Sequence, residues 1–163
     1  MRTVEGDLLE LAEDGEFDVI AHGCNCFCNM GKGIALSIRR RYPAAFAADR
    51  ATDKGARSKL GTCTYAVVSG RTQPFIIVNA YTQFHWTGVM PLADYDAIRR
   101  CFRWLRETHG GKRIGLPRIG AGLAGGDWAT ISELLLAELG DQDVTVVEYR
   151  HGAPRAGPAA EAR

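Results

Sequence analysis

Apolar positions recur along this chain in two alternating patterns. Short apolar runs rich in β-branched and aromatic residues predict strands, at residues 2–4, 17–21, 62–68, 75–80, 114–116 and 144–149. Amphipathic or Ala-rich stretches between them predict helical segments, at residues 8–12, 34–42, 44–51 and 94–109 and from an Asp127 cap to Leu139. Strands that alternate with helices predict an α/β fold with a mostly parallel sheet.

Composition narrows the class of protein. The 163 residues are 46% hydrophobic and 24% charged, which is typical of one soluble domain. A net charge of +1 disfavours a protein held on nucleic acid mainly by charge, and it suits a small-molecule site. We expect the domain over residues 1–150 and a disordered tail over residues 151–163. Five cysteines, with no membrane-spanning stretch and no signal peptide, predict a cytoplasmic protein with reduced thiols and no membrane contact.

Two glycine-rich loops carry the candidate chemistry. Residues 22–33 follow a predicted strand and precede a helix, and residues 120–126 repeat this order. Their Gly and Asn content predicts loops throughout. Glycine allows the backbone to approach a phosphate, and the following helix offers free N–H groups. Because the carboxyl ends of parallel strands share one edge of a sheet, the two loops are expected to face each other and clamp a diphosphate.

Three other interpretations of these segments were considered. Gly120, Gly122 and Gly125 match the dinucleotide-binding fingerprint, but that unit should open the fold, and here almost nothing follows it. A glycine turn without a ligand is also possible. Cys24, Cys26 and Cys28 alternate and would point the same way in an extended segment, yet zinc sites favour wider cysteine spacing, so buried thiols and no metal are expected.

At these residues the sequence resembles the macro domain family over nearly the whole of residues 3–149. The resemblance is carried by four ordered motifs: Gly6-Asp7-Leu8, the run from Val19 to Cys26 with Met30 to Ala35, Val78 to Gln83, and Leu116 to Gly125. Within the family, His22-Gly23-Cys24-Asn25-Cys26 and Arg41-Tyr42-Pro43 look like the branch of yeast-type ADP-ribose 1″-phosphate phosphatases. That branch also holds terminal ADP-ribose protein glycohydrolases and antitoxins that remove ADP-ribose from DNA. It implies a three-layer α/β/α domain with a mixed sheet and an ADP-ribose cleft.

The resemblance also implies roles for individual residues. Asp7, followed by Leu8, matches the acid that binds the adenine amino group, although it also suits a helix cap. Asn25 matches a contact to the distal ribose, although it also suits a turn. Tyr149 lies where an aromatic residue stacks on adenine. The loops over the distal ribose and the diphosphate correspond to Gly31, Lys32, Gly33, Ile34, Gly120, Ala121, Gly122, Leu123, Ala124 and Gly125.

One departure from the branch affects the expected reaction. Its glycohydrolases carry a catalytic lysine where this chain has Gln83, and an acidic partner where it has Ala124. Glutamine cannot attack an anomeric carbon as an amine can. We therefore expect hydrolysis of ADP-ribose 1″-phosphate to ADP-ribose and phosphate, without a cofactor. The catalytic candidates are Asn25, His22, His85 and Gln83.

Other functions and groups remain open at this stage. The alternatives are a lysine-independent mono-ADP-ribosyl hydrolase acting on protein or nucleic acid, and a non-catalytic ADP-ribose reader. Cys24 or Cys26 could act as a nucleophile, but neither lies in a recognisable phosphatase loop. The basic run at residues 39–41 spreads over different faces of its predicted helix, so a solvated surface is expected there.

Overall fold

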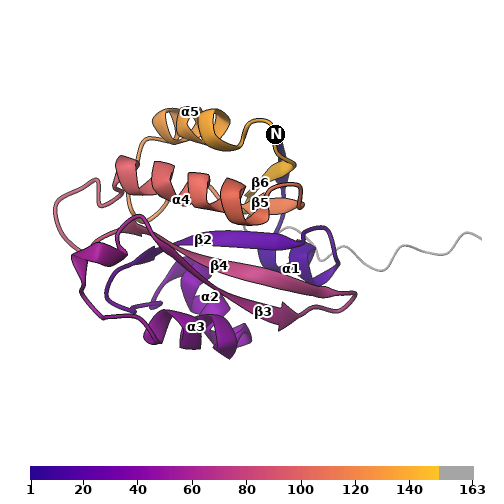
Figure 1. Ribbon diagram of the computed structural model, residues 1–163, viewed down its shortest axis with the longest axis horizontal. Coiled ribbons are helices and arrows are strands. Elements are labelled where there is room, and N and C mark those ends of the chain that lie inside the picture. The colour runs from indigo at the N-terminus through magenta and orange to yellow at the C-terminus, as the bar shows by residue number, and fades with distance from the viewer. Residues whose placement is uncertain (151–163) are drawn as a thin grey trace, which may run out of the picture.

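A computed structural model describes residues 1–150 and contains one six-stranded mixed sheet (Figure 1). The strand order is β1-β6-β5-β2-β4-β3, and every neighbouring pair is parallel except β3 and β4. The strands are β1 (Arg2–Glu5), β2 (Val19–Asn25), β3 (Cys63–Ser69), β4 (Pro74–Gln83), β5 (Ile114–Leu116) and β6 (Val144–Glu148). This order differs from that of a dinucleotide-binding fold, in which the glycine fingerprint follows the first strand.

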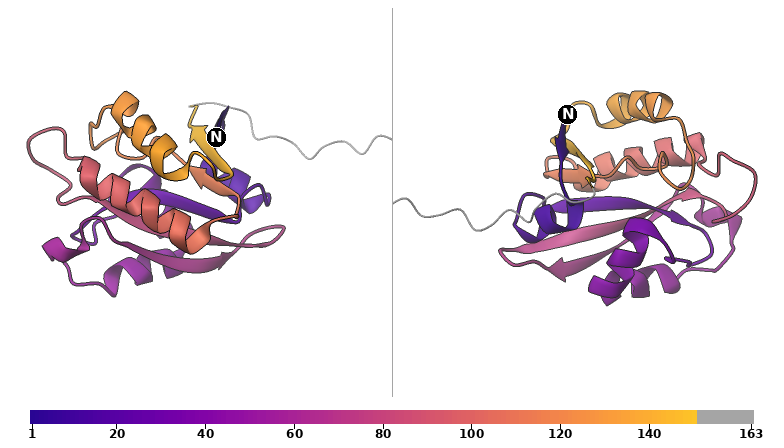
Figure 2. Two further views of the ribbon diagram at one scale, coloured as in Figure 1. Left: turned by 45° about the horizontal axis from the view of Figure 1, so that its top comes forward. Right: turned by 180° about the vertical axis from the view of Figure 1, so that it is seen from behind.

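Helices cover both faces of the sheet, which confirms the predicted three-layer α/β/α arrangement. Helices α1 (Leu8–Glu13), α2 (Gly33–Arg41) and α3 (Pro43–Arg50) pack on one face. Helices α4 (Tyr95–His109) and α5 (Trp128–Leu139) pack on the other face. Figure 2 shows the two layers from further directions. A short 3-10 helix, η1 (Arg57–Lys59), was not predicted.

The period-two pattern of the central strands divides the core between the two layers. In β2, Val19 and Ala21 contact the core under α4 and α5, whereas Ile20 contacts the core under α1, α2 and α3. In β4, Val78 and Phe75 divide in the same way. Because both faces of these strands are buried, their sequences read as continuous apolar runs rather than as alternating ones.

Most predicted element boundaries are confirmed within a few residues, but one is wrong in a way that concerns the site. The sequence was expected to become a loop at His22, whereas β2 continues to Asn25. Strand β2 lies between β5 and β4, and its residues from His22 to Cys24 pair with β4. Gly23 suits this crowded position, because a Cβ there would lie 2.7 Å from the Thr82 hydroxyl. The predicted tail lies outside the described residues.

Candidate functional site

A cavity of about 840 Å³ opens where β2, β4, β5 and β6 end. Both glycine-rich loops contribute to its wall. The predicted site residues that line it are Asn25, Gly31, Lys32, Gly33, Ile34, Gln83, Gly120, Gly122, Leu123, Ala124 and Tyr149. Those that do not line it are Asp7, Leu8, His22, His85, Ala121 and Gly125. The carboxyl-end position follows from the parallel strands, as ligand sites do in open α/β sheets.

The second glycine loop leaves backbone amides unpaired in the cavity wall. Gly120 has a φ of 76° and Gly125 a φ of 68°, values that glycine tolerates best. The loop closes on itself through the Gly126 amide, which donates to the Gly120 carbonyl at 2.8 Å. Within residues 1–150, the amides of Gly122, Leu123 and Ala124 have no acceptor. Three unpaired N–H groups along a cavity wall form a concave site suited to an anion.

The first loop supplies the opposing wall through the start of α2. Lys32 is the N-cap of α2, and its side chain makes no capping hydrogen bond. The first amides of α2, which belong to Gly33 and Ile34, therefore lack a side-chain acceptor. Both residues line the cavity. A Cβ on Gly33 would lie 3.4 Å from the Leu123 Cδ1 atom, so the two loops approach each other closely here.

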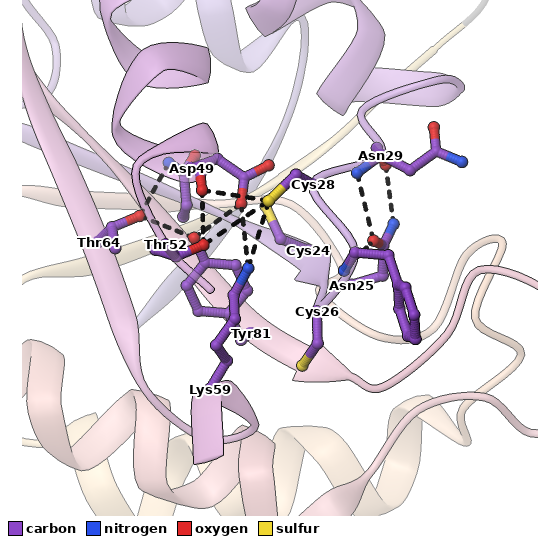
Figure 3. Close-up of polar contacts among 12 residues, drawn as sticks. Cys24, Asn25, Cys26, Cys28, Asn29, Asp49, Thr52, Lys59, Thr64 and Tyr81 are labelled. Atoms are coloured by element: carbon purple, nitrogen blue, oxygen red, sulfur yellow. Dashed lines mark hydrogen bonds and ion pairs between the residues drawn. The ribbon is translucent and has the colours of Figure 1, made fainter. Parts of the chain in front are cut away.

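Asn25 lines the cavity and also stabilises the turn that follows β2. Its Oδ1 accepts from the Phe27 amide at 2.9 Å, and its Nδ2 donates to the Asn29 carbonyl at 2.8 Å (Figure 3). Asn25 is buried, with 7% of the residue exposed. These bonds match the turn role considered from the sequence, so a direct ribose contact by this amide must share its polar atoms with the turn.

The two candidate histidines lie outside the cavity wall. His22 is fully buried, and its Nε2 lies 2.7 Å from the Asn79 Oδ1. Burial lowers the pKa of His22 to about 4, although the Asn79 hydrogen bond opposes this shift. The His85 Nδ1 accepts from the Thr87 amide and lies 3.1 Å from its hydroxyl, while the His85 ring stacks on Trp86. His22 is therefore a neutral core group, and His85 positions the segment that carries Trp86 and Thr87 into the cavity wall.

The three alternating cysteines occupy different environments. Cys24 lines the cavity, but burial raises the pKa of its thiol, which disfavours a thiolate nucleophile. Cys26 is buried, and its thiol donates to the Gln83 carbonyl. Cys28 has a φ of 55° and lies beside Lys59 and the Asp49 carbonyl (Figure 3). Cys24 and Cys26 belong to one buried cluster with Met30 and Tyr81, whereas Cys28 follows the turn after β2, which ends at Asn25. Among residues 1–150, no cluster of three metal-ligating side chains occurs.

The far end of the cavity is formed by the end of β6. Arg118 Nε lies 3.0 Å from the Glu148 Oε1, and both side chains line the cavity with Tyr149. Asp7 follows β1, the strand that pairs with β6. It caps α1 by accepting from the Leu9 and Glu10 amides. Both cap bonds use Oδ1, so the Asp7 Oδ2 has no partner among the described residues. Arg118, Trp86 and Asn29 were not predicted as site residues.

The fold and site thus define a three-layer α/β/α domain with a cavity between two glycine-rich loops. A family model for the Macro domain matches residues 21–135, and the chain belongs to that family. A solved structure titled macrodomain of Mycobacterium tuberculosis DarG has a TM-score of 0.64 and 28% identity, and the match covers 91% of this chain and 95% of that one. In the part of the chain that the structure describes, no helix is long and apolar enough to cross a membrane.

Three curated relatives show how far the similarity extends. An uncharacterized 17.5 kDa protein of Enterobacteria phage T4 is 32% identical over 91% of this chain and 96% of its own length. The DNA ADP-ribosyl glycohydrolase of Mycobacterium tuberculosis is 32% identical over 86% of this chain and 40% of its own length. The ADP-ribose 1''-phosphate phosphatase of Aspergillus clavatus is 46% identical over 34% of this chain and 26% of its own length. The chain therefore spans less than half of either named enzyme.

Proposed function

We propose that this macro domain binds ADP-ribose and hydrolyses the bond between its distal ribose and the group attached at C1″. The observation that carries the proposal is the pair of loops around one cavity, whose wall holds the unpaired amides of Gly122, Leu123 and Ala124 and the start of α2. Backbone amides and a helix start bind phosphate oxygens without needing a large positive charge. Lys32 adds one cation in the same wall.

In this proposal the nucleotide runs from the end of β6 to the ends of β2 and β4. Tyr149 lines the end beside β6, where its ring can stack on adenine, and the Asp7 Oδ2 retains capacity to accept from an amino group. The diphosphate then lies between the two glycine loops. The distal ribose reaches Asn25, Gln83 and Trp86, which line the cavity at the ends of β2 and β4.

Hydrolysis in this proposal does not use a lysine. Gln83 donates from Nε2 to the His85 carbonyl at 2.9 Å, so its amide is held in one orientation. Its Oε1 has no protein partner among residues 1–150 and is available to accept from a water molecule or a ribose hydroxyl. An amide orients water without removing its proton, so rate enhancement comes from positioning and from stabilisation of the leaving group's charge.

Two leaving groups have support. The short match to a phosphatase, together with the absent lysine, supports phosphate as the leaving group. The longer match, over 86% of this chain, is to a protein named for action on DNA, and it supports a macromolecule as the second candidate. Both reactions leave ADP-ribose in the cavity, so binding of ADP-ribose is common to them.

The test combines binding and turnover in one sample. Calorimetry with ADP-ribose should show one site, and the same protein should then release phosphate from ADP-ribose 1″-phosphate. Release of free ADP-ribose from an ADP-ribosylated oligonucleotide or peptide would select the second candidate. Binding without either release would establish a reader. Absence of ADP-ribose binding would contradict the assignment of both glycine loops.

A further inference from the structure

A lysine and a carboxylate are buried together beside the turn that follows β2, and the proposed function uses neither of them. Lys59 ends η1 with a side chain that is 6% exposed, and the Asp49 side chain, on α3, is 1% exposed. The Lys59 Nζ lies 3.8 Å from the Asp49 Oδ1 and 4.5 Å from the centroid of the Tyr81 ring (Figure 3). None of these residues lines the cavity. Because burial of two charges carries a large desolvation penalty, stability alone is a weak explanation for this pair.

The Asp49 carboxylate is satisfied at one of its two oxygens. The Tyr81 hydroxyl donates to Oδ1 at 2.8 Å, and Lys59 approaches the same oxygen. Within residues 1–150, Oδ2 is buried and has no hydrogen-bond partner. A buried carboxylate oxygen without a donor is unusual, and it is typical of groups that take up a proton or act in redox chemistry. Asp49 therefore holds an oxygen that can accept a proton inside the protein.

The third member of the group is the thiol of Cys28, in the turn after β2. Its Sγ lies 3.5 Å from the Lys59 Nζ, which donates to it, and 3.3 Å from the Asp49 carbonyl oxygen (Figure 3). Cys28 is partly exposed, whereas Cys24 and Cys26 are buried. Cys28 is therefore the thiol of this stretch that a small solute can reach, and its neighbour is a primary amine. We call Cys28, Asp49 and Lys59 the lysine–cysteine cluster.

The lysine–cysteine cluster contains the groups needed to turn a contact into a covalent bond. Hydrogen peroxide oxidises a thiol to a sulfenic acid and is itself reduced to water. A sulfenic acid condenses with a neighbouring nitrogen to give a sulfenamide. In the cluster, the Lys59 ammonium first gives one proton to Asp49, whose Oδ2 is free to take it. The amine then attacks the Cys28 sulfur, so that an S–N bond forms, the S–O bond breaks, and hydroxide leaves with the second amine proton as water.

We propose that Cys28 and Lys59 form a modification site at which hydrogen peroxide links their side chains through a sulfenamide. The product contains a neutral nitrogen and a protonated Asp49, so the reaction also removes the buried ion pair and its desolvation penalty. The long, flexible lysine side chain can close the 3.5 Å between the two reacting atoms.

The link would join the turn after β2 to η1, close to the cavity. Asn29 follows Cys28 and lines the cavity, and its carbonyl accepts from the Asn25 amide. Oxidation would therefore fix the turn that Asn25 stabilises. This inference does not rest on the proposed hydrolysis, since the link forms between two side chains of the protein and can be measured without a nucleotide.

The test treats the full, reduced chain with hydrogen peroxide and measures its mass after denaturation without a reductant. The wild type should lose about 2 Da, the mass of the two hydrogens removed when a thiol and an amine form a sulfenamide. A tryptic digest should join residues 3–32 to residues 58–71, because trypsin does not cut after a modified Lys59. Fragmentation of this product should place the bond between the Cys28 sulfur and the Lys59 nitrogen, and dithiothreitol should reverse it. Absence of the joined product after oxidation of Cys28 would overturn the proposal.

Matched variants distinguish the sulfenamide from a disulfide, because the joined segments also contain Cys63. Lys59→Arg keeps the positive charge and Cys28→Ser keeps the side-chain size, and each should lower the yield of the joined product at least about tenfold. Oxidised Lys59→Arg should instead carry a sulfenic acid at Cys28, which dimedone traps. Cys63→Ser should retain the product within about twofold, because Cys63 takes no part in the reaction. A product that persists in Lys59→Arg and disappears in Cys63→Ser would identify a disulfide and refute the site.

Discussion

At the scale of single residues, the proposed hydrolysis depends on Gln83, which is expected to orient the attacking water. It lines the cavity, and its amide is fixed by the His85 carbonyl. We predict that Gln83→Ala lowers the turnover number by about 100-fold, or about 3 kcal/mol, while the dissociation constant for ADP-ribose changes less than about twofold, because the amide is proposed to orient the attacking water and makes at most one of many contacts to the nucleotide. Single-turnover kinetics and calorimetry on the same variant measure both quantities. Unchanged turnover would remove Gln83 from the mechanism.

His22 gives a residue-scale prediction about stability. Burial lowers its pKa from 6.5 to about 4, so the folded state resists protonation more than the unfolded chain does. The unfolded state therefore binds more protons between these values, and stability falls as the pH drops from about 6.5 towards 4. The largest loss from this one group is about 3 kcal/mol.

Urea unfolding of the wild type and of His22→Gln at several pH values checks this expectation. The variant should show a flatter dependence, with a residual slope from His109, whose pKa burial also lowers. Asp18, whose pKa its bond to Arg113 lowers to about 2, contributes only at more acidic pH. His22→Gln should retain turnover near neutral pH, since His22 does not line the cavity. Identical slopes for both proteins would refute the assigned role.

At the scale of elements, the sequence predicts those helices and loops whose positions depend on local residue patterns. Helix α4 could be placed because Ile98, Phe102 and Leu105 follow its period, and the start of α5 because Asp127 accepts from the Thr130 amide. The glycine loops were correctly placed between strand and helix. The continuation of β2 through His22 could not be predicted, because it depends on pairing with β4, more than 50 residues away.

The site shows the same division between local and distant information. Gly33 and Gly122 line the cavity as predicted, because the glycine-rich loops can be recognised from their local sequence. His22 is buried and hydrogen-bonded to Asn79, a partner 57 residues away that no local pattern reveals. Trp86 was missed because its exposure and its place in the cavity wall follow from stacking on His85. The available signal was a Trp three residues after Gln83, the end of the central motif.

The second glycine loop allows binding and stability to be separated at neighbouring positions. A Cβ on Gly122 would meet nothing within 4 Å, so Gly122→Ala should change stability by less than about 0.5 kcal/mol. Because Gly122 lines the cavity, the added methyl group should weaken ADP-ribose binding about tenfold, or about 1.4 kcal/mol. Calorimetry and thermal unfolding measure the two effects.

Gly120→Ala serves as the matched comparison in the same loop. Gly120 has a φ of 76°, and a Cβ there would lie 2.8 Å from the Ile98 Cδ1. This variant should lose about 1–3 kcal/mol of stability, because it combines backbone strain with overpacking. If Gly122→Ala instead destabilises the fold as much as Gly120→Ala, the loop has a structural role and the case for a phosphate site weakens.

At the scale of the whole molecule, one sheet separates two surfaces that differ in how their arginines are paired. The cavity lies along the carboxyl edge of the strands, arginines without a carboxylate partner among residues 1–150 lie on α2, α3 and η1, and paired arginines lie on α4. A net charge near zero conceals this arrangement, so the composition of the whole chain does not indicate where unpaired cations gather. Charge balance over a chain describes solubility better than it describes local recognition.

The extent of the folding unit is the remaining whole-molecule prediction. The three apolar clusters involve residues between Val4 and Val147, and the cavity wall ends at Tyr149. A variant that ends at residue 150 should therefore unfold cooperatively, with a midpoint within about 2 °C of the full chain, since a change of 1 kcal/mol moves the midpoint by about 2–8 °C in domains of this size range. Differential scanning calorimetry checks the midpoint, and titration with ADP-ribose checks the cavity. A lower midpoint would place residues 151–163 within the cooperative unit. An unchanged midpoint with weaker nucleotide binding would instead place them at the site.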